Sequence, residues 1–258
     1  MDVQTLVVLM GSILGLLVGS FSNVCVYRIP RGESIAFPGS HCPNCAHEIA
    51  WYDNIPVCSW LILKAKCRHC QVPISGRYPF LELLMGISWG LLAWKFGPTP
   101  MLLEAWLLVS FLWILSLIDY ETGYLPDVLT LSGMVLGLGF AWWIGDWEAS
   151  LVGAVLGYGV FWLIAKAFFL LTHKEGMGAG DFKLLAMLGA FMGWQALPFV
   201  VFLSSVMGTV VGLIYLKVSG LGKQTEIPFG PYLAVAGMVW FVWGHDIGLA
   251  YMAWMLPQ

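Results

Sequence analysis

The sequence predicts an all-α polytopic membrane protein that crosses the bilayer about eight times. The chain has 258 residues, of which 59% are hydrophobic and 10% charged, and its mean hydropathy is +0.82. Soluble domains carry about 25% charged residues, so this composition excludes an ordinary soluble protein. A helix needs about 20 apolar residues to span a bilayer. Runs near that length are found at 3–26, 79–96, 101–119, 128–145, 149–171, 182–196, 198–217 and 229–255.

Three parts follow one another along the chain. Residues 1–26 are predicted to form the first transmembrane helix, 27–78 a polar loop domain, and 79–258 the remaining spans. The first helix is not predicted to be a cleaved signal peptide, since no basic stretch precedes it and basic residues follow. His245-Asp246 interrupts the last span. Glycine and proline mark the connections Phe96-Gly97-Pro98, Gly123-Tyr124-Leu125-Pro126, Gly176–Gly180 and Pro228-Phe229-Gly230-Pro231.

Positive charge predicts the orientation, because loops rich in Lys and Arg stay on the cytoplasmic side. All Lys and Arg residues except Lys95 fall on one side of the predicted bundle or near its ends. We therefore expect the N-terminus outside and the loop 27–78 in the cytoplasm. The residues that decide this are Arg28, Arg31, Lys64, Lys66, Arg68, Arg77, Lys166, Lys174, Lys183, Lys217 and Lys223.

Two C-x-x-C pairs lie in the polar loop, Cys42-Pro43-Asn44-Cys45 and Cys67-Arg68-His69-Cys70. Each pair places two thiolates on one tight turn, and four thiolates complete a tetrahedral zinc site. The loop is too small to bury a sufficient core, so a metal would help to hold it folded. Such a site has no open position for water, which predicts a structural zinc in a zinc-stabilised loop domain. A redox pair, or thiols without a metal, are the alternatives, although a reducing cytoplasm argues against disulfides.

The other cysteines and the loop histidines are expected to stay outside this metal site. Cys25 lies in an apolar span and Cys58 between the two pairs, and both are expected to be small buried side chains. His41, His47 and His69 are able to replace a cysteine ligand, but solvated loop positions are expected for them.

Two aspartates lie where a membrane protein rarely places them. Asp119 closes the apolar run Trp106–Ile118, and Asp181 ends Gly178-Ala179-Gly180-Asp181, just before the apolar run Leu184–Met192. A carboxylate at membrane depth is costly and is found where it faces a bundle interior, a wet cavity or a partner. The topology puts both at the cytoplasmic ends of spans, where two carboxyl groups that share a proton activate water and protonate a leaving amine. The sequence thus predicts Asp119 and Asp181 as a catalytic pair of the aspartic-protease kind.

Other interpretations of these aspartates stay open. An aspartate at a helix start, such as Asp181, is often an N-cap, and Asp119 at a helix end is placed to be solvated. Asp127 competes with Asp119, although its position between Pro126 and a span favours capping. The glycines before Asp181 permit a close backbone approach, along which a substrate strand would fit.

These motifs together resemble the type IV prepilin peptidase family, membrane aspartyl proteases of the Gly-x-Gly-Asp type whose longer members are also N-methyltransferases. The resemblance extends along nearly the whole chain. In the first half it rests on Gly19–Val24, Arg28-Ile29-Pro30, Cys42–Cys45, Ile49–Pro56, Ser59-Trp60-Leu61, Lys66–Cys70, Ile74–Pro79 and Glu82. In the second half it rests on Ile118-Asp119, Leu125-Pro126-Asp127, Gly178–Lys183 and Ile227–Pro231.

The resemblance implies that Asp119 and Asp181 carry a peptidase reaction at the cytoplasmic face of the bacterial inner membrane. It implies cleavage of a short basic leader, after a glycine, from type IV prepilins or secretion pseudopilins. Methylation of the new N-terminal amine, usually of phenylalanine, would follow with S-adenosylmethionine as the donor. The expected partners are these substrates and membrane lipid, not nucleic acid. Without a Rossmann unit, only the loop 27–78 and its neighbouring span ends are nominated for the S-adenosylmethionine pocket.

Three alternative functions are kept. The first is a proton-coupled transporter, which also places carboxylates in the membrane. The second is a zinc-stabilised scaffold of a pilus or secretion machine, which would need no catalysis. The third is a peptidase that does not methylate its product. Glu82, Glu121 and Glu175 are placed to attract a basic leader, but solvated loop charges are the simpler expectation.

Overall fold

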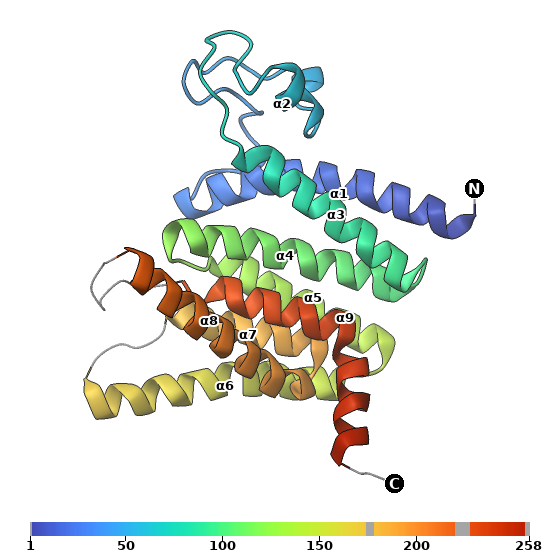
Figure 1. The fold of residues 1–258 in the computed structure, drawn as a ribbon, viewed down its shortest axis with the longest axis vertical. Coiled ribbons are helices and arrows are strands. Elements are labelled where there is room, and N and C mark those ends of the chain that lie inside the picture. The colour runs from blue at the N-terminus through green and yellow to red at the C-terminus, as the bar shows by residue number, and fades with distance from the viewer. Residues whose placement is uncertain (1, 174–177, 220–227, 256–258) are drawn as a thin grey trace. The chain divides into compact units, whose positions relative to one another are not determined.

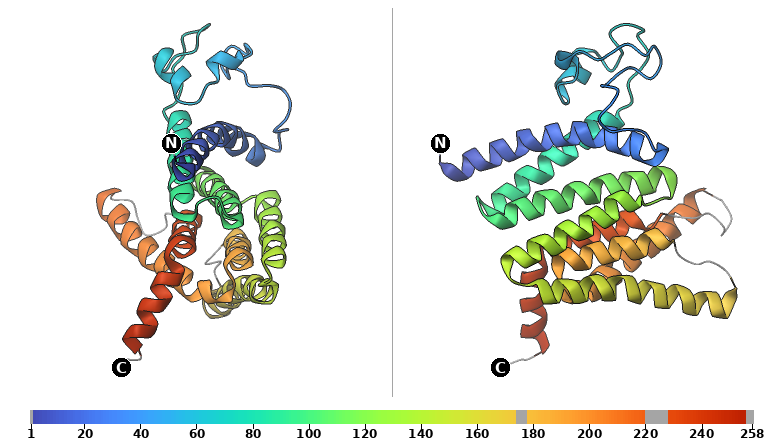
Figure 2. Two further views of the ribbon diagram at one scale, coloured as in Figure 1. Left: turned by 90° about the vertical axis from the view of Figure 1, so that its right-hand side faces the viewer. Right: turned by 180° about the vertical axis from the view of Figure 1, so that it is seen from behind.

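The computed structural model describes residues 2–173, 178–219 and 228–255, and the regular structure in these ranges is helical (Figures 1 and 2). Lys174, Glu175, Lys223, Ile227 and the first residues of the predicted Gly176–Gly180 connection lie outside the described residues. The chain divides into two compact units, Met1–Ile114 and Leu115–Gln258, and one helix contributes to both.

The all-α fold class is confirmed. Eight long helices in the described residues coincide with the eight predicted spans. Six segments are long and apolar enough to cross a membrane; α3 and α7 are not among them, because α3 carries charged residues and α7 is only 14 residues long. The helices are α1 (Val3–Arg28), α3 (Arg77–Phe96), α4 (Pro100–Thr122), α5 (Asp127–Ile144), α6 (Trp147–Thr172), α7 (Ala179–Met192), α8 (Leu197–Ser219) and α9 (Gly230–Met255).

In the first unit, α1 and α3 lie side by side (Figure 1). Gly11, Gly15 and Gly19 repeat every four residues along α1 and are buried. A β-carbon on Gly15 would lie 2.8 Å from the Met85 carbonyl oxygen of α3. Small residues at this spacing let two backbones approach closely in lipid, so the sequence itself specifies this helix pair.

The loop between α1 and α3 contains little regular structure. It holds the short 3-10 helices η1 (Ile29–Arg31) and η2 (Trp51–Asp53) and the five-residue helix α2 (Cys58–Ile62). Large apolar side chains stay exposed on it, with Trp51 81% exposed and Ile62 75% exposed. Apolar burial therefore supplies little of the stability of this loop.

In the second unit, α7 packs against α5 and α6. All of its residues from Leu184 to Phe191 are buried. A helix that is apolar on every side must be surrounded by other helices, as α7 is. This environment holds the first turn of α7, where Asp181 lies, in a fixed place.

One of the predicted spans is wrong. The predicted span 182–196 is not one helix: α7 ends at Met192 and a 3-10 turn, η3 (Trp194–Ala196), leads into α8. Gly193 between them has φ +74° and ψ 173°, a conformation open to glycine, and it ends the helix. Helix α9 runs through His245 and Asp246, the polar residues that interrupt the apolar run of the last span, and its C-terminal part points in a different direction from its first part (Figure 1).

Candidate active site and metal centre

Asp119 lies in the last turn of α4 and is 5% exposed. Its Oδ2 atom accepts a hydrogen bond of 2.8 Å from the backbone N–H of Gly230, the first residue of α9. A carboxylate is unfavourable at the C-terminal end of its own helix and favourable at the N-terminal end of another. The first turn of α9 therefore compensates the charge of Asp119. A β-carbon on Gly230 would lie 2.6 Å from Oδ2, so only glycine permits this contact.

Asp181 lies in the first turn of α7 and is 8% exposed. Its carboxylate does not cap the helix: Gly178 occupies the N-cap position and no side chain forms a cap bond there. The carboxyl groups of Asp181 and Asp119 are close enough for their charges to interact. The structure thus brings together the two predicted aspartates, both within the second unit.

Aromatic side chains pack behind this carboxyl pair. Phe161 of α6 is 2% exposed and lies 6.5 Å from Phe182 and 6.2 Å from Phe229, measured between ring centroids. Phe182 follows Asp181 and Phe229 precedes Gly230 in the sequence. One buried ring therefore contacts the neighbours of both segments that position the carboxyl groups.

Asp127, the alternative to Asp119 as a catalytic aspartate, has a different environment. Its side chain is 54% exposed and forms an ion pair with Lys183, two residues beyond Asp181. Gly180 packs against the same segment, because a β-carbon there would lie 2.8 Å from Cβ of Leu125. The close approach predicted at the glycines is made, at Gly180, by Leu125 of the chain itself. Asp127 and Leu125 thus hold the first turn of α7.

The four predicted cysteine ligands form a cluster in the first unit. Their Sγ atoms, from Cys42, Cys45, Cys67 and Cys70, all lie within 4.8 Å of one another. Two sulfurs on a tetrahedral zinc ion with Zn–S bonds of about 2.3 Å are roughly 3.8 Å apart. The 3.7 Å between the sulfurs of Cys42 and Cys70 matches that spacing. The donor set therefore fits a metal ion of this kind.

The two cysteine turns repeat one backbone pattern. The N–H of Cys42 donates to the His47 carbonyl and that of Cys67 to the Val72 carbonyl, both at 2.9 Å. The residue after each second cysteine, Ala46 or Gln71, has a positive φ. Such turns point two sulfurs of each pair in the same direction, which preorganises the cluster for a metal.

Local donors also favour the thiolate form that metals require. The backbone N–H of Val72 and the side-chain amide of Asn44 donate to the Cys70 sulfur and lower the pKa of Cys70 to about 6. These donors stabilise the thiolate form of Cys70, and the thiolate is the form that binds a metal.

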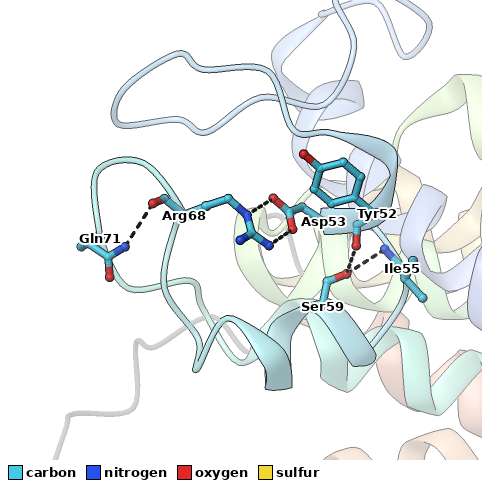
Figure 3. Close-up of polar contacts among 6 residues, drawn as sticks. All are labelled: Tyr52, Asp53, Ile55, Ser59, Arg68 and Gln71. Atoms are coloured by element: carbon cyan, nitrogen blue, oxygen red, sulfur yellow. Dashed lines mark hydrogen bonds and ion pairs between the residues drawn. The ribbon is translucent and has the colours of Figure 1, made fainter.

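An ion pair joins the second cysteine turn to η2, as Figure 3 shows. Arg68 donates from Nε and Nη2 to the two carboxylate oxygens of Asp53, at 2.7 and 2.6 Å. This guanidinium holds the pKa of Asp53 below its usual value. Ser59 of α2 donates to the Tyr52 carbonyl and accepts the N–H of Ile55, so the segment 52–59 is tied together.

The structure tests the exposure expected for other cysteine, histidine and glutamate side chains. Cys25 is buried as expected, but Cys58 is exposed, because it begins the short surface helix α2. His41, His47 and His69 are exposed and lie outside the sulfur cluster. Glu121 is exposed as a solvated charge would be, whereas Glu82 is only 7% exposed. The expectation of a solvated Glu82 is therefore wrong.

Sequence reasoning did not foresee the burial of three polar side chains. Besides Glu82, the structure buries Asn23 of α1 and Glu104 of α4 at 2% and 5% exposure. The Asp127–Lys183 ion pair was not foreseen either. The sequence held one indication that Glu82 is buried, because it shares a helix face with the apolar Leu81 and Met85. The apolar pattern of α3 alone does not show whether that face points into the protein.

Comparisons with known proteins show which family the chain resembles. Residues 13–96 match the model of the bacterial peptidase A24 N-terminal domain, and residues 106–213 match that of the type IV leader peptidase family. The curated relatives include proteins named prepilin leader peptidase/N-methyltransferase. The chain is 42% identical to that of Stutzerimonas stutzeri (95% of this chain, 93% of the relative) and 42% to that of Pseudomonas aeruginosa (93% and 91%). It is 40% identical to that of Neisseria gonorrhoeae (95% and 94%). No solved structure gives a significant match.

Proposed function

The chain belongs to the type IV leader peptidase family, and on that premise we propose that it cleaves the basic leader from type IV prepilins or pseudopilins and then methylates the new N-terminal amine. The buried carboxyl pair Asp119 and Asp181 carries the first half of this proposal. A pilin-like substrate has an apolar helix in the bilayer, so its cleavage site lies at the membrane surface. A carboxyl pair at the ends of two helices is suited to meet it there.

The proposed cleavage uses one shared proton. Two adjacent carboxyl groups ionise one at a time, so the pair holds a base and an acid together. Asp119, which accepts the N–H of Gly230 near the positive end of α9, is suited to carry the charge and take a proton from water. Asp181 is then suited to give its proton to the leaving amine. The water oxygen bonds to the carbonyl carbon, the C–N bond breaks, and the leader leaves with a new carboxylate.

For methylation we propose that Cys42, Cys45, Cys67 and Cys70 hold a structural zinc ion that keeps the loop folded. S-adenosylmethionine, when bound, supplies an electrophilic methyl group. The loop and the adjacent ends of α1 and α3 belong to the region that matches the N-terminal domain model. We assign the methylation half to this region.

We further propose that this multi-pass protein lies in the bacterial inner membrane with its N-terminus outside. The concentration of Lys and Arg in the loop and near later helix ends supports this orientation. Labelling of single cysteines by a membrane-impermeant thiol reagent in intact cells tests it. Protection of Cys58 in the loop is expected, and its labelling from outside would reverse the assigned orientation.

The test incubates the purified protein with a prepilin, with and without S-adenosylmethionine, for the wild type, Asp119→Asn and Asp181→Asn. Each substitution is expected to reduce cleavage by about 1,000-fold or more, because the pair acts as one unit. Methylation of a peptide supplied already cleaved should continue in both variants, which also shows that they are folded. Cleavage at the wild-type rate by either variant would disprove the assignment.

The peptidase without methylation is distinguished in the same assay. In that case the mature pilin made in the presence of S-adenosylmethionine would be lighter by one methylene group than the methylated product. Mass spectrometry of the pilin measures this difference. The proton-coupled transporter and the non-catalytic scaffold are disfavoured, because relatives that match over nearly their full lengths carry enzyme names.

A further inference from the structure

A buried carboxylate in the first unit has no part in the proposed cleavage. Glu82 lies in the second turn of α3 and is 7% exposed. Its Oε2 atom accepts the backbone N–H of Val57 at 2.7 Å, and Ser20 of α1 also bonds to the carboxylate. A carboxylate has about four acceptor positions, so two further donors fit it. Burying such a group costs desolvation free energy unless hydrogen bonds or an opposite charge offset it.

A second acceptor with spare capacity lies on α1. Asn23 is 2% exposed, and its side-chain nitrogen donates to the carbonyl oxygens of Gly19 and Tyr78. Those two carbonyl partners fix which end of the amide is the nitrogen. The Oδ1 atom is buried and accepts no hydrogen bond from the residues that the structure describes. Buried polar atoms of this kind are rare unless a ligand or water completes them.

The two acceptors belong to one stretch of the contact between α1 and α3. A β-carbon on Gly19, one turn before Asn23, would lie 2.7 Å from the Cα atom of Glu82. Tyr78, the partner of Asn23, lies one turn before Glu82 on α3. Asn23 and Glu82 are therefore about one helical turn apart along the same contact.

The loop contributes a strained residue at this place. Val57 has φ +61° and ψ −49°, a conformation that β-branched residues rarely adopt. Its N–H is the one that Glu82 accepts. Strained backbone held by a specific contact is commonest at functional sites. The buried cation at the end of α1, Arg28, has other partners, since its guanidinium donates to the carbonyls of Ser34 and Gly39.

We infer that Glu82 and Asn23 form a binding site for a primary ammonium group, a part of the proposed methylation that no sequence motif assigns. An ammonium has three donors and a positive charge, which suits a carboxylate and an amide oxygen with free acceptor positions. The inference rests on the proposed function, which supplies two such groups. One is the new N-terminus of the cleaved pilin, and the other is the amino-acid end of S-adenosylmethionine.

If the bound group is the pilin N-terminus, Glu82 also takes part in the chemistry. The bound ammonium has no lone pair, so it first gives one proton to the Glu82 carboxylate and becomes a neutral amine, which then attacks the methyl group. As the N–C bond to the methyl group forms, the S–C bond breaks and the sulfonium becomes a neutral thioether. The products would be a methylated ammonium, a protonated Glu82 and a neutral thioether, so the total charge is unchanged.

The first experiment measures binding, independently of turnover, with the full-length protein in detergent. The probe is a synthetic apolar peptide that begins with phenylalanine, in a free-amine and an N-acetylated form. The wild type is expected to bind the free-amine form about tenfold more tightly, as charge-assisted hydrogen bonds allow. Glu82→Gln should abolish that preference, while its amide oxygen still accepts the N–H of Val57. The matched control is Glu104→Gln, which neutralises another buried carboxylate of the first unit and should keep the preference.

The same proteins are then titrated with S-adenosylmethionine, which shows whether the bound ammonium group belongs to the pilin N-terminus or to S-adenosylmethionine. Loss of the peptide preference with unchanged S-adenosylmethionine affinity assigns the site to the pilin N-terminus. An S-adenosylmethionine affinity about tenfold weaker in Glu82→Gln, with the peptide preference kept, assigns it to the amino-acid end of that molecule. Wild-type values for both ligands in Glu82→Gln would overturn the inference.

Cleavage and methylation of a prepilin by the same preparations complete the test. Glu82→Gln is expected to cleave within about twofold of the wild type, which shows that it is folded, and to methylate at least about 100-fold more slowly. A wild type that prefers the free amine but never methylates would contradict the proposed methylation and leave the ammonium site standing.

Discussion

The carboxyl pair of the second unit and the cysteine loop of the first are held in place by opposite means. Asp181 begins a helix whose residues Leu184 to Phe191 are all buried, so packing fixes its position. The loop instead exposes Trp51 and Ile62, and its turns at Ala46 and Gln71 have positive φ. Apolar burial stabilises the first region, whereas it contributes little to the second, where we propose a bound metal as the main stabilising element. The two proposed reactions should therefore respond differently to the same treatment.

Metal removal should give the largest difference between the regions. A chelator, or Cys67→Ser combined with Cys70→Ser, is expected to reduce methylation by about 100-fold or more, because metal binding supplies folding free energy to such loops. Cleavage should change less than about twofold, since packing fixes the carboxyl pair. Parallel assays of both reactions measure this.

Cys58→Ser is the matched control, because Cys58 is an exposed cysteine of the same loop outside the sulfur cluster. It should leave both reactions unchanged. Equal loss of cleavage and methylation on metal removal would mean that the metal supports the peptidase as well.

The pH dependence should distinguish the reactions next. Cleavage needs one ionised and one protonated carboxyl group, so its rate is expected to fall about tenfold per pH unit on both sides of an optimum. Both limbs belong to the pair and not to either aspartate alone. The measurement is single-turnover cleavage of a prepilin across the pH range in which the protein stays folded. A flat profile would remove the support for a shared proton.

Loss of the ion pair between Asp127 and Lys183 should have a moderate effect on cleavage alone. Lys183→Met is expected to slow cleavage by about fivefold, as a partly exposed pair contributes about 1 kcal/mol or less. The charge swap Asp127→Lys with Lys183→Asp should restore part of the rate. Lys166→Met, on α6, serves as a control for loss of one positive charge. A swap no better than the single variant would argue against positioning through this pair.

Loss of the ion pair between Asp53 and Arg68 should have the smallest effect, and on methylation alone. The Arg68 guanidinium is about half exposed, so solvent screens the pair, and Asp53→Asn is expected to slow methylation by less than about twofold at neutral pH. Arg68 lowers the pKa of Asp53, so its stabilising contribution is present above the ordinary aspartate pKa and lost as the pH falls through the lowered one. A tenfold loss of methylation in Asp53→Asn would instead give this pair a direct role.

Particular residues explain where prediction from the sequence succeeded. The span positions followed from apolar runs, and the cysteine cluster followed from two short spacings, because both are local signals. Gly193 was overlooked inside an apolar run, so one predicted span merged a buried helix with a turn. The burial of Glu82 does not follow from the sequence, since the direction of a helix face depends on the neighbouring helices and not on its own residues.

The sequence by itself determined the membrane class, the helix positions and the residue types able to perform acid–base and metal chemistry, because hydropathy and short spacings are read within single segments. Only the tertiary structure decided that Asp119 meets Asp181 and the N–H of Gly230, that Asp127 pairs with Lys183, and that Glu82 lies buried beside Asn23. These contacts join segments far apart in the chain. They depend on how helices pack, which no local pattern encodes.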